Sequence, residues 1–445
     1  MRKPEAPPPH DSRNYALLRE PDQLIQGLTA IRHNPLVNGK YLHWDELRRR
    51  PKPAEMSHED WWCLVKYVRI AMENPLPLQG INGNPFVYVV VPPIPESLRN
   101  IDLSAGGRIG VPDQIMNPET RDRYYVSSLI EEAITSSQLE GATTTHRVAE
   151  DMIRSGRDPR DKSERMILNN FNTMRRIGEL KREPLTPEIV LELHRTVTDQ
   201  TLGSADQAGR LRRSDEDYVV KNLERDEILH VPPPADQLPD RLKAMCAFAN
   251  NEAMDEFLHP VLNAIILHFW LAYDHPFVDG NGRTARALFY WSMLKEGYWL
   301  FEFVSISRIL KSAPAQYGLA FLHSETDGND LTYFLLHQIG VINRAIEELN
   351  TYIEKKTQET RTLERKLKGV SQLNHRQRAL IAHALRHPNH EYSIESHRMS
   401  HSIVYETART DLLDLVRRGL LSVSKNGRTQ YFTPILDLER KLRDA

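Results

Sequence analysis

The sequence predicts a mainly α protein with a small β-hairpin and a separate C-terminal domain. Apolar residues recur at helical spacing through most of the chain, whereas the β-branched runs at residues 86–91 and 227–231 are short and stopped by proline. Residues 258–273 are apolar nearly all round, which is typical of a central buried helix. After residue 369, three helical stretches precede a hairpin, and this is the element order of a winged helix.

Composition indicates an ordinary soluble globular protein. The 445 residues are 27% charged and 40% hydrophobic, and a net charge of −2 offers no global signature for nucleic acid or membrane. Two cysteines, Cys63 and Cys246, are too few for a disulfide framework or a zinc site. The N-terminus lacks the apolar core of a signal peptide, and no run has the length of a membrane helix. We therefore expect a cytoplasmic protein with no membrane partner.

The N-terminal quarter of the chain reads as an arm followed by helices. Residues 1–20 are polar and proline-rich, so we expect a poorly ordered or extended arm. Residues 21–120 form a mainly helical region, with helical spacing from residue 21 to residue 88. Trp61 and Trp62 suggest a binding patch, but core packing is the better interpretation because Trp is mostly buried in such helices.

A helical stretch at residues 121–154 carries a polar pattern. Ser136 and Glu140 are four residues apart, hence on one helix face, and Gly141 is a natural helix stop. Taken alone, this pattern is also typical of a solvated glutamate at a helix end.

Further helices are expected at residues 164–180, 186–198, 237–250, 305–321 and 331–352. His259 and His268 fall within the central apolar stretch, and we interpret both as packing or hydrogen-bonded core histidines. Residues 353–369 are charged and have helical propensity, so they predict a helical linker that ends near Gly369.

Residues 275–286 directly follow the central helix and read His-Pro-Phe-Val-Asp-Gly-Asn-Gly-Arg-Thr-Ala-Arg. Glycines before a helix start let backbone N–H groups converge on an anion, which the helix dipole also favours. Arg283 and Arg286 share a helix face and suit a polyphosphate. Asp279 is a hard oxygen ligand suited to Mg²⁺, and His275 suits proton transfer near neutrality. The set indicates phosphate chemistry with a general base.

This segment resembles the signature of Fic-domain proteins, His-Pro-Phe-x-Asp/Glu-Gly-Asn-Gly-Arg-x-x-Arg, with every specified position present. The resemblance covers residues 121–352 and implies a Fic-type helical bundle with a β-hairpin flap, an N-terminal extension and a C-terminal winged-helix domain at residues 370–445. It also implies adenylylation (AMPylation), in which a Ser, Thr or Tyr hydroxyl of a protein, the enzyme itself included, attacks the α-phosphate of ATP. A homodimer is expected from the resemblance alone.

The resemblance assigns roles within the motif. His275 is the general base, and Asp279 holds a Mg²⁺ ion that bridges the α- and β-phosphates. Backbone N–H groups and the Asn281 amide contact phosphate oxygens, while Arg286 binds the γ-phosphate. The residues placed at the nucleotide are Gly280, Asn281, Gly282, Arg283, Thr284, Arg286, Leu229, His230 and Tyr317.

Two segments outside the motif take on meaning from the resemblance. Residues 227–234 resemble the flap over the active site, whose edge pairs with the backbone of a target protein, although a plain surface hairpin fits them as well. Ser136, Glu140 and Gly141 fit the inhibitory motif Ser/Thr-x-x-x-Glu-Gly/Asn. In that case Glu140 pairs with Arg286 in the resting enzyme, and ATP loses the contact to its γ-phosphate.

Three alternatives stay open. In the first, the same site removes AMP from a modified protein, and Glu140 positions the attacking water. A few Fic relatives transfer phosphate or phosphocholine instead, although the intact Asp279 and Gly-Asn-Gly-Arg run favour AMP. In the third, the chain is a DNA-binding regulator with a vestigial Fic domain. The presence of His275, Asp279, Asn281 and both arginines argues against such a loss of the active site.

The C-terminal domain is the expected place for DNA contact. Helices at residues 377–384 and 392–399 precede a third, which begins at Ser402 and ends near residue 418, and a hairpin turns at Asn426 and Gly427. The residues that would face a DNA groove are Tyr405, Thr407, Arg409 and Thr410. The acidic residues that interrupt this positive face are Glu406, Asp411 and Asp414. Dimerisation or partner docking is therefore favoured over DNA binding.

Overall fold

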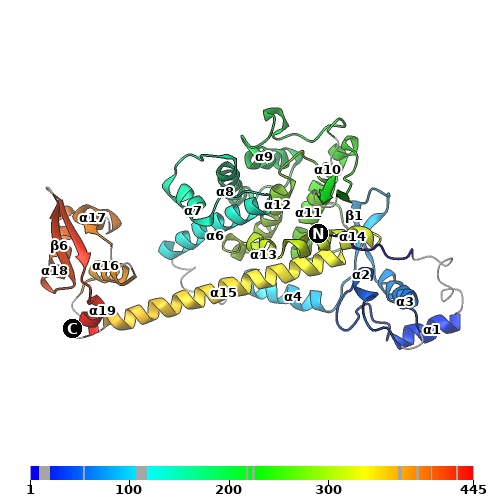
Figure 1. Cartoon of the computed structure of the whole chain (residues 1–445), viewed down its shortest axis with the longest axis horizontal. Coiled ribbons are helices and arrows are strands. Elements are labelled where there is room, and N and C mark those ends of the chain that lie inside the picture. Colours follow the sequence, from blue (N-terminus) through cyan, green and yellow to red (C-terminus); the bar gives the residue numbers. More distant parts are fainter. Residues whose placement is uncertain are drawn as a thin grey trace. The chain divides into compact units, whose positions relative to one another are not determined.

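The computed structural model describes residues 2–9, 21–53, 56–106, 118–216, 219–222, 226–368, 373–386, 390–401, 403–426 and 429–443. The chain divides into two compact units, Met1–Leu349 and Asn350–Ala445. It is mainly helical, with three small antiparallel sheets among the described residues, so the predicted fold class is confirmed (Figure 1). Residues 10–20 of the predicted arm, Gly369, Ser402 and Gly427 lie outside the described residues.

The first unit begins with a small α/β region. Its elements are α1 (Pro21–Ala30), α2 (Trp44–Leu47), α3 (His58–Ile70), β1 (Asn74–Gln79), β2 (Pro85–Tyr88), α4 (Pro93–Ile101) and the π-helical turn η2 (Asp102–Gly106). Trp61 and Trp62 are buried, as core packing predicts. The expectation of helix up to residue 88 is wrong for β1, which pairs with β2 in an irregular register. Pro75 and Pro77 argue against a strand at the sequence level, because proline is tolerated in a strand only at an edge or a bulge.

The rest of the first unit is a helical bundle (Figure 1). Its helices are α6 (Pro118–Leu139), α7 (His146–Ser155), α8 (Lys162–Leu180), α9 (Pro187–Thr198), α10 (Leu238–Ala249), α11 (Pro260–Asp274), α12 (Asn281–Lys295), α13 (Ile306–Ser312), α14 (Pro314–Thr326) and α15 (Thr332–Lys368), with turns η3 (Ala205–Gln207), η4 (Ala235–Gln237) and η5 (Trp299–Glu302). As predicted, α11 is buried along nearly its whole length. It packs on α12, which in turn contacts α6, α8 and α9. The motif connects these two central helices.

Two predicted helices are each divided in the structure. The stretch at residues 121–154 forms α6 and α7, because Gly141 adopts a φ of 93° just after α6 ends. The stretch at residues 305–321 breaks at Ala313, because Pro314 cannot continue the preceding helix and begins α14. By contrast, α15 runs without a break from residue 332 through the predicted helical linker to residue 368.

The predicted flap strand is present. Strand β4 (Glu227–His230) pairs antiparallel with β3 (Val220–Asn222), and the register shifts between Val220 and Lys221. The sequence predicts β4 from its apolar run, whereas the β3 segment reads only as polar. The hairpin lies in the first unit with the motif.

The second unit has its own core and sheet. Its elements are α16 (His375–Arg386), β5 (Tyr392–Ser393), α17 (Ile394–His401), α18 (Tyr405–Arg417), β6 (Leu421–Asn426), β7 (Thr429–Pro434) and α19 (Leu438–Arg443). The strands lie in the order β5-β7-β6 around a core that includes Ile381, Leu412 and Phe432. Three helices and a hairpin follow in the predicted order. The second helix begins later than predicted, because Tyr392 and Ser393 pair with β7 instead.

The acidic interruption predicted on α18 is wrong for Asp411. Its side chain is buried and accepts hydrogen bonds from Asn374 at 2.7 Å and Arg376 at 2.6 Å, so it holds α16 and α18 together. Glu406 remains on the surface, where it pairs with Arg409 at 3.0 Å. The cation proposed for a DNA groove therefore already has an anionic partner on its own helix.

Neither cysteine forms a disulfide, and both are buried. In the part of the chain that the structure describes, every helix is too short or too polar to cross a membrane.

Candidate active site

The motif loop is closed by its own side chains. His275 ends α11 in the left-handed conformation, with φ 45° and ψ 54°. Beyond it, the Phe277 N–H donates to Asn281 Oδ1 at 2.9 Å, and Asn281 Nδ2 donates to the Phe277 carbonyl at 2.7 Å. The Asn281 amide, expected at a phosphate, is thus engaged within the loop. Its contribution to an anion would come from its backbone N–H.

Both glycines of the loop lie close against neighbouring side chains. Gly280 has a φ of 88°, and a Cβ there would lie 2.6 Å from Thr198 Cγ2. A Cβ on Gly282 would lie 2.1 Å from Glu140 Oε1. The Thr284 hydroxyl, also expected at the nucleotide, is buried and donates to the Gly280 carbonyl at 2.9 Å. The first turn of α12 therefore presents bare backbone, with the Glu140 carboxylate against it.

Arg286 is buried and donates hydrogen bonds to residues at the end of α6. Its Nε donates to Ser136 Oγ at 2.8 Å, and its Nη2 donates to the Ser136 carbonyl and to Glu140 Oε1, both at 3.0 Å. Burial opposes the charged guanidinium, but Glu140 and other acidic groups outweigh it, so the pKa of Arg286 is raised. The contact between Glu140 and Arg286 that the sequence suggests is present in the structure.

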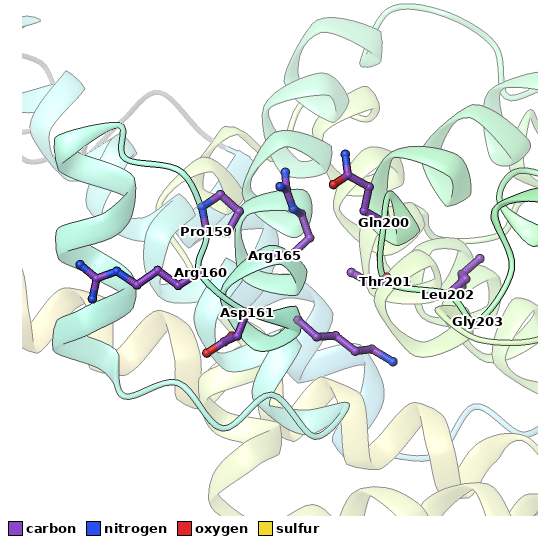
Figure 2. Close-up of a pocket in the computed structure, with 9 residues that line it drawn as sticks. Pro159, Arg160, Asp161, Arg165, Gln200, Thr201, Leu202 and Gly203 are labelled. Atoms are coloured by element: carbon purple, nitrogen blue, oxygen red, sulfur yellow. The ribbon is translucent and has the colours of Figure 1, made fainter.

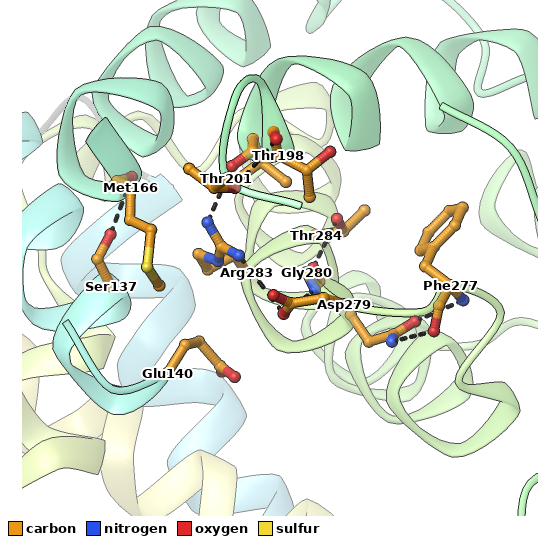
Figure 3. Close-up of polar contacts among 12 residues, drawn as sticks. Ser137, Glu140, Met166, Thr198, Thr201, Phe277, Asp279, Gly280, Arg283 and Thr284 are labelled. Carbon is orange, nitrogen blue, oxygen red and sulfur yellow. Dashed lines mark hydrogen bonds and ion pairs between the residues drawn. The ribbon is translucent and has the colours of Figure 1, made fainter. Parts of the chain in front are cut away.

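Arg283 is also buried, but most of its hydrogen-bonding capacity is unused. Its Nη1 donates to the Val197 carbonyl at 2.9 Å, whereas Nε and Nη2 have no hydrogen-bond partner. The nearest carboxylate, Asp279, lies 3.6 Å from Nη2, beyond hydrogen-bond distance (Figure 3). Burial lowers the pKa of Arg283. Buried N–H groups without acceptors are costly, so this side chain is suited to an incoming anion.

His275 is an unprotonated imidazole at neutral pH. Burial lowers its pKa to about 4, and the nearby charges of His230 and Arg212 act in the same direction. A hydrogen bond with the Ala272 backbone acts against this shift. The sequence suggests a pKa near ambient pH, but the free protein holds the ring further toward its neutral, proton-accepting form.

A cavity of about 270 Å³ brings the predicted residues together. Those that line it are Glu140, Leu229, His230, His275, Asn281, Gly282, Arg286 and Tyr317. The predicted residues that do not line it are Ser136, Gly141, Asp279, Gly280, Arg283 and Thr284. The Asp279 side chain is 46% exposed and lies beside Arg283 (Figure 3). The cavity is thus bounded by the motif, by the flap and α14, and by the end of α6.

Two residues that no sequence motif marks, His194 and Arg212, hold the loop in place. His194 on α9 stacks on Phe277 with ring centroids 3.7 Å apart. Its Nδ1 accepts from the Gly209 N–H at 3.0 Å, so its Nε2 must carry the proton donated to the Asp279 carbonyl at 2.9 Å. Arg212 donates to the His275 carbonyl at 3.0 Å and to the carbonyl of Pro233 beyond the flap. The roles of these two residues could not be predicted from residue spacing, because the residues that they contact are distant in the sequence.

A second hollow, of about 340 Å³, lies between the start of α8 and the segment at residues 200–203 (Figure 2). It is lined by basic side chains, but those of Arg160 and Arg165 point in different directions. No residue of the motif lines it. The motif cavity is therefore the better candidate active site.

Comparison with known proteins agrees with this geometry. Residues 184–293, which run from before α9 to within α12, match the model of the Fic/DOC family. The chain carries a Fic domain. The end of α6 and helix α14, which also bound the cavity, lie outside this matched segment.

The relatives of this Fic domain are similar over a limited length. Two curated relatives are named "Protein adenylyltransferase Fic". The one from Nematostella vectensis is 36% identical over 120 residues, which is 26% of this chain and 25% of the relative. The one from Drosophila mojavensis is 36% identical over 116 residues, or 26% of this chain and 20% of the relative. The chain thus spans a quarter or less of the length of these relatives.

A solved structure shares the fold. It is a Fic family protein from Desulfovibrio desulfuricans G20, with a TM-score of 0.53 and 18% sequence identity, covering 78% of this chain and 98% of that one. This likeness shows the Fic fold for most of the chain.

Proposed function

We propose that the chain is a protein adenylyltransferase that moves AMP from ATP to a Ser, Thr or Tyr hydroxyl of a protein, itself included, and that Glu140 restrains it at rest. One observation carries the proposal: the Glu140 carboxylate lies against Gly282 at the N-terminal turn of α12 and on Arg286. That turn favours an anion, and in a Fic domain it is the place for phosphate. The names of the curated relatives support the same activity.

The side chains suit attack at the α-phosphate. The target hydroxyl forms a bond to phosphorus while the bond to the bridging oxygen breaks, and pyrophosphate leaves with that electron pair. The neutral His275 ring accepts the hydroxyl proton. The unpaired N–H groups of Arg283 and the first N–H groups of α12 stabilise the negative charge. Of these groups, His275 lines the cavity, the first turn of α12 has the Glu140 carboxylate against it, and Arg283 lies outside the cavity lining.

Asp279 is suited to hold Mg²⁺ with the nucleotide. Its carboxylate is nearly half exposed beside the first turn of α12. Mg²⁺ usually takes one or two carboxylates together with substrate phosphates, and the described residues contain no cluster of three or more metal-ligating side chains that would form a complete protein cage. A bound Mg²⁺ would neutralise charge on the phosphates.

Restraint by Glu140 follows from the hydrogen bonds of Arg286. Its Nε and Nη2 are already taken by Ser136 and Glu140, so a γ-phosphate would have to displace the carboxylate before it could bind there. A carboxylate and a phosphate compete for one guanidinium because the oxygens of both accept charge-assisted hydrogen bonds from its N–H groups. Removing the carboxylate should therefore open the site.

Labelling with ATP that is radioactive at the α-phosphate tests the proposal. Glu140→Gly should incorporate more label into itself than the wild type does, and Glu140→Gln should also incorporate more, because it keeps the size of the side chain but loses its charge. Adding His275→Ala to Glu140→Gly should lower the rate about 10²- to 10⁴-fold. Equal labelling of wild type and Glu140→Gly would refute the restraint. Robust labelling with His275→Ala would refute the general base, and no labelling of any variant would refute the activity.

Removal of AMP is a second candidate, because Glu140 and His275 line the same cavity. There, Glu140 would position a water molecule for attack on an AMP-modified hydroxyl. Wild-type protein added to labelled Glu140→Gly protein would release labelled AMP if this reaction occurs, and stable label would exclude it.

A further inference from the structure

The flap carries a histidine whose two ring nitrogens both face hydrogen-bond acceptors. His230 is the last residue of β4 and is only 8% exposed. Its Nδ1 lies 2.7 Å from Glu325 Oε2 on α14. Its Nε2 lies 2.7 Å from the Tyr273 carbonyl oxygen in the last turn of α11. The histidine therefore bridges the flap, α14 and the helix that ends at His275.

The two contacts indicate the protonation state of the ring. A neutral imidazole has one N–H, so one of its nitrogens would face an acceptor with a lone pair at 2.7 Å. A carbonyl oxygen has no proton to donate, and an imidazole is ordinarily a stronger base than a carboxylate. An imidazolium at His230 paired with an ionised Glu325 satisfies both contacts.

The end of α11 also favours a cation at His230. In a continuing helix the Tyr273 carbonyl would accept from the N–H of Phe277, but that N–H donates to Asn281 Oδ1. His230 supplies the missing donor to Tyr273. A positive charge at a helix C-terminus is also favoured by the helix dipole.

The other charged groups around the bridge already have partners or act with it. Asp274, next to Tyr273, is buried and bound to Arg241 at 2.5 Å. Arg212 is bound to the carbonyls of His275 and Pro233. After burial, the positive charge of His230 is the next largest cause of the lowered pKa of His275. Glu325 is thus the anion directly available to His230.

We propose that His230, held as an imidazolium between Glu325 and the Tyr273 carbonyl, is a positioning residue that fixes the flap against the end of α11. This inference rests on the proposed adenylyltransferase function. If a target segment pairs with the edge of the flap, the bridge sets the distance between its hydroxyl and His275, which lies two residues beyond Tyr273. The flap is then held by the charged bridge at His230 and also by the hydrogen bond from Arg212 to the Pro233 carbonyl.

The protonation state can be measured without any activity. Nitrogen-15 NMR of the histidine rings, with the His230 signals assigned by their loss in His230→Gln, should show two N–H groups on His230 at neutral pH. In Glu325→Gln the same ring should show one. A single N–H on His230 in the wild type would overturn the proposal.

Kinetics test the positioning role in the Glu140→Gly background. Glu325→Gln should lower the kcat of AMP transfer about 10- to 100-fold, as expected when reacting groups are misplaced, and leave the KM for ATP unchanged. Adding Glu325→Gln to His230→Gln should cause no further loss, because the two residues act as one unit. A rise in the KM for ATP with kcat intact would overturn the positioning role.

A matched control lies on the same flap. Lys221 and Asp226 form an exposed ion pair at 3.3 Å, so Asp226→Asn removes a flap ion pair that does not contact α11 or α14. It should leave kcat unchanged, and a loss equal to that of Glu325→Gln would contradict the specific role of the bridge. If Glu140→Gly itself transfers no AMP, the proposed function fails, while the NMR measurement still decides whether the bridge exists.

Discussion

At the residue scale, the two arginines of the motif differ in how far their guanidinium groups are hydrogen-bonded. Arg286 directs its Nε and Nη2 at Ser136 and Glu140, whereas the Nε and Nη2 atoms of the buried Arg283 have no hydrogen-bond partner. The sequence suggests that both grip one polyphosphate. The structure places them differently: Arg283 is buried outside the cavity lining, whereas Arg286 lines the cavity and is bound to Glu140.

The low pKa of His275 predicts the pH dependence of the reaction. In the proposed reaction the neutral ring is the base, so activity should be present above its pKa and should be lost as the pH falls through it. With a pKa of about 4 in the free protein, kcat/KM of Glu140→Gly should stay constant from pH 8 down to about pH 5.5. An ordinary histidine would already lose the base form near pH 6.5. Initial rates of α-label incorporation across this range, below saturating ATP, check the prediction, and a midpoint near 6.5 would contradict it.

At the element scale, α6 docks on α12 through a polar stripe. Glu132, Ser136 and Glu140 follow one another at intervals of four residues. Glu132 accepts from the Tyr290 hydroxyl at 2.8 Å, one turn along α12 from Arg286. Glu132 is buried and also holds the start of α13 through Ser305 and Ser307. The proposed restraint by Glu140 would thus depend on a helix that Glu132 anchors to α12 and α13.

Removing this anchor should destabilise the first unit. Glu132→Ala leaves the N–H and the hydroxyl of Ser307 without their acceptor, and the Tyr290 hydroxyl keeps only its longer contact to the Val304 carbonyl at 3.1 Å. Each unsatisfied buried group costs about 1–3 kcal/mol. We expect a loss of about 3 kcal/mol or more in the free energy of unfolding, measured by urea denaturation.

The neighbouring glutamate provides the control for this loss. Glu131 pairs with His146 on the surface at 2.7 Å, and Glu131→Ala should cost only about 0–1 kcal/mol. Equal losses for the two variants would show that Glu132 does not anchor the helix.

The sequence predicts elements whose signals are local. The apolar stretch that predicts the buried helix α11 and the glycine that predicts the end of α6 are both signals within a few neighbouring residues. The structure confirms the buried helix and the positive φ of Gly141. Strand β1 was missed because its prolines oppose strand formation in general and only its edge position permits it. Glu132 and Arg212 were missed because their partners are 158 and 63 residues away, and no periodicity encodes such contacts.

At the scale of the whole molecule, the chain is built from two units with separate cores. The C-terminal core is formed by residues between Leu373 and Leu442 only. The homodimer, the cytoplasmic location and the use of the C-terminal unit for docking or DNA stay predictions from the sequence. The groups proposed for catalysis all lie in the first unit.

Deleting residues 370–445 should therefore leave AMP transfer intact. In the Glu140→Gly background we expect a labelling rate and a melting transition of the first unit equal to those of the longer chain, because no cavity residue and no described core residue of the Fic domain is removed. Calorimetry and α-label incorporation check this. Loss of labelling in a shortened protein that still melts cooperatively would place part of the active site in the C-terminal unit.

The central claim is that this site transfers AMP and that Glu140 restrains the transfer. It is tested most directly by giving Glu140→Gly protein ATP that carries the label at either the α- or the γ-phosphate, beside the wild type. We expect incorporation of the α-label, no incorporation of the γ-label, and much weaker α-labelling of the wild type. Incorporation of the γ-label, or α-labelling as strong in the wild type as in Glu140→Gly, would contradict it.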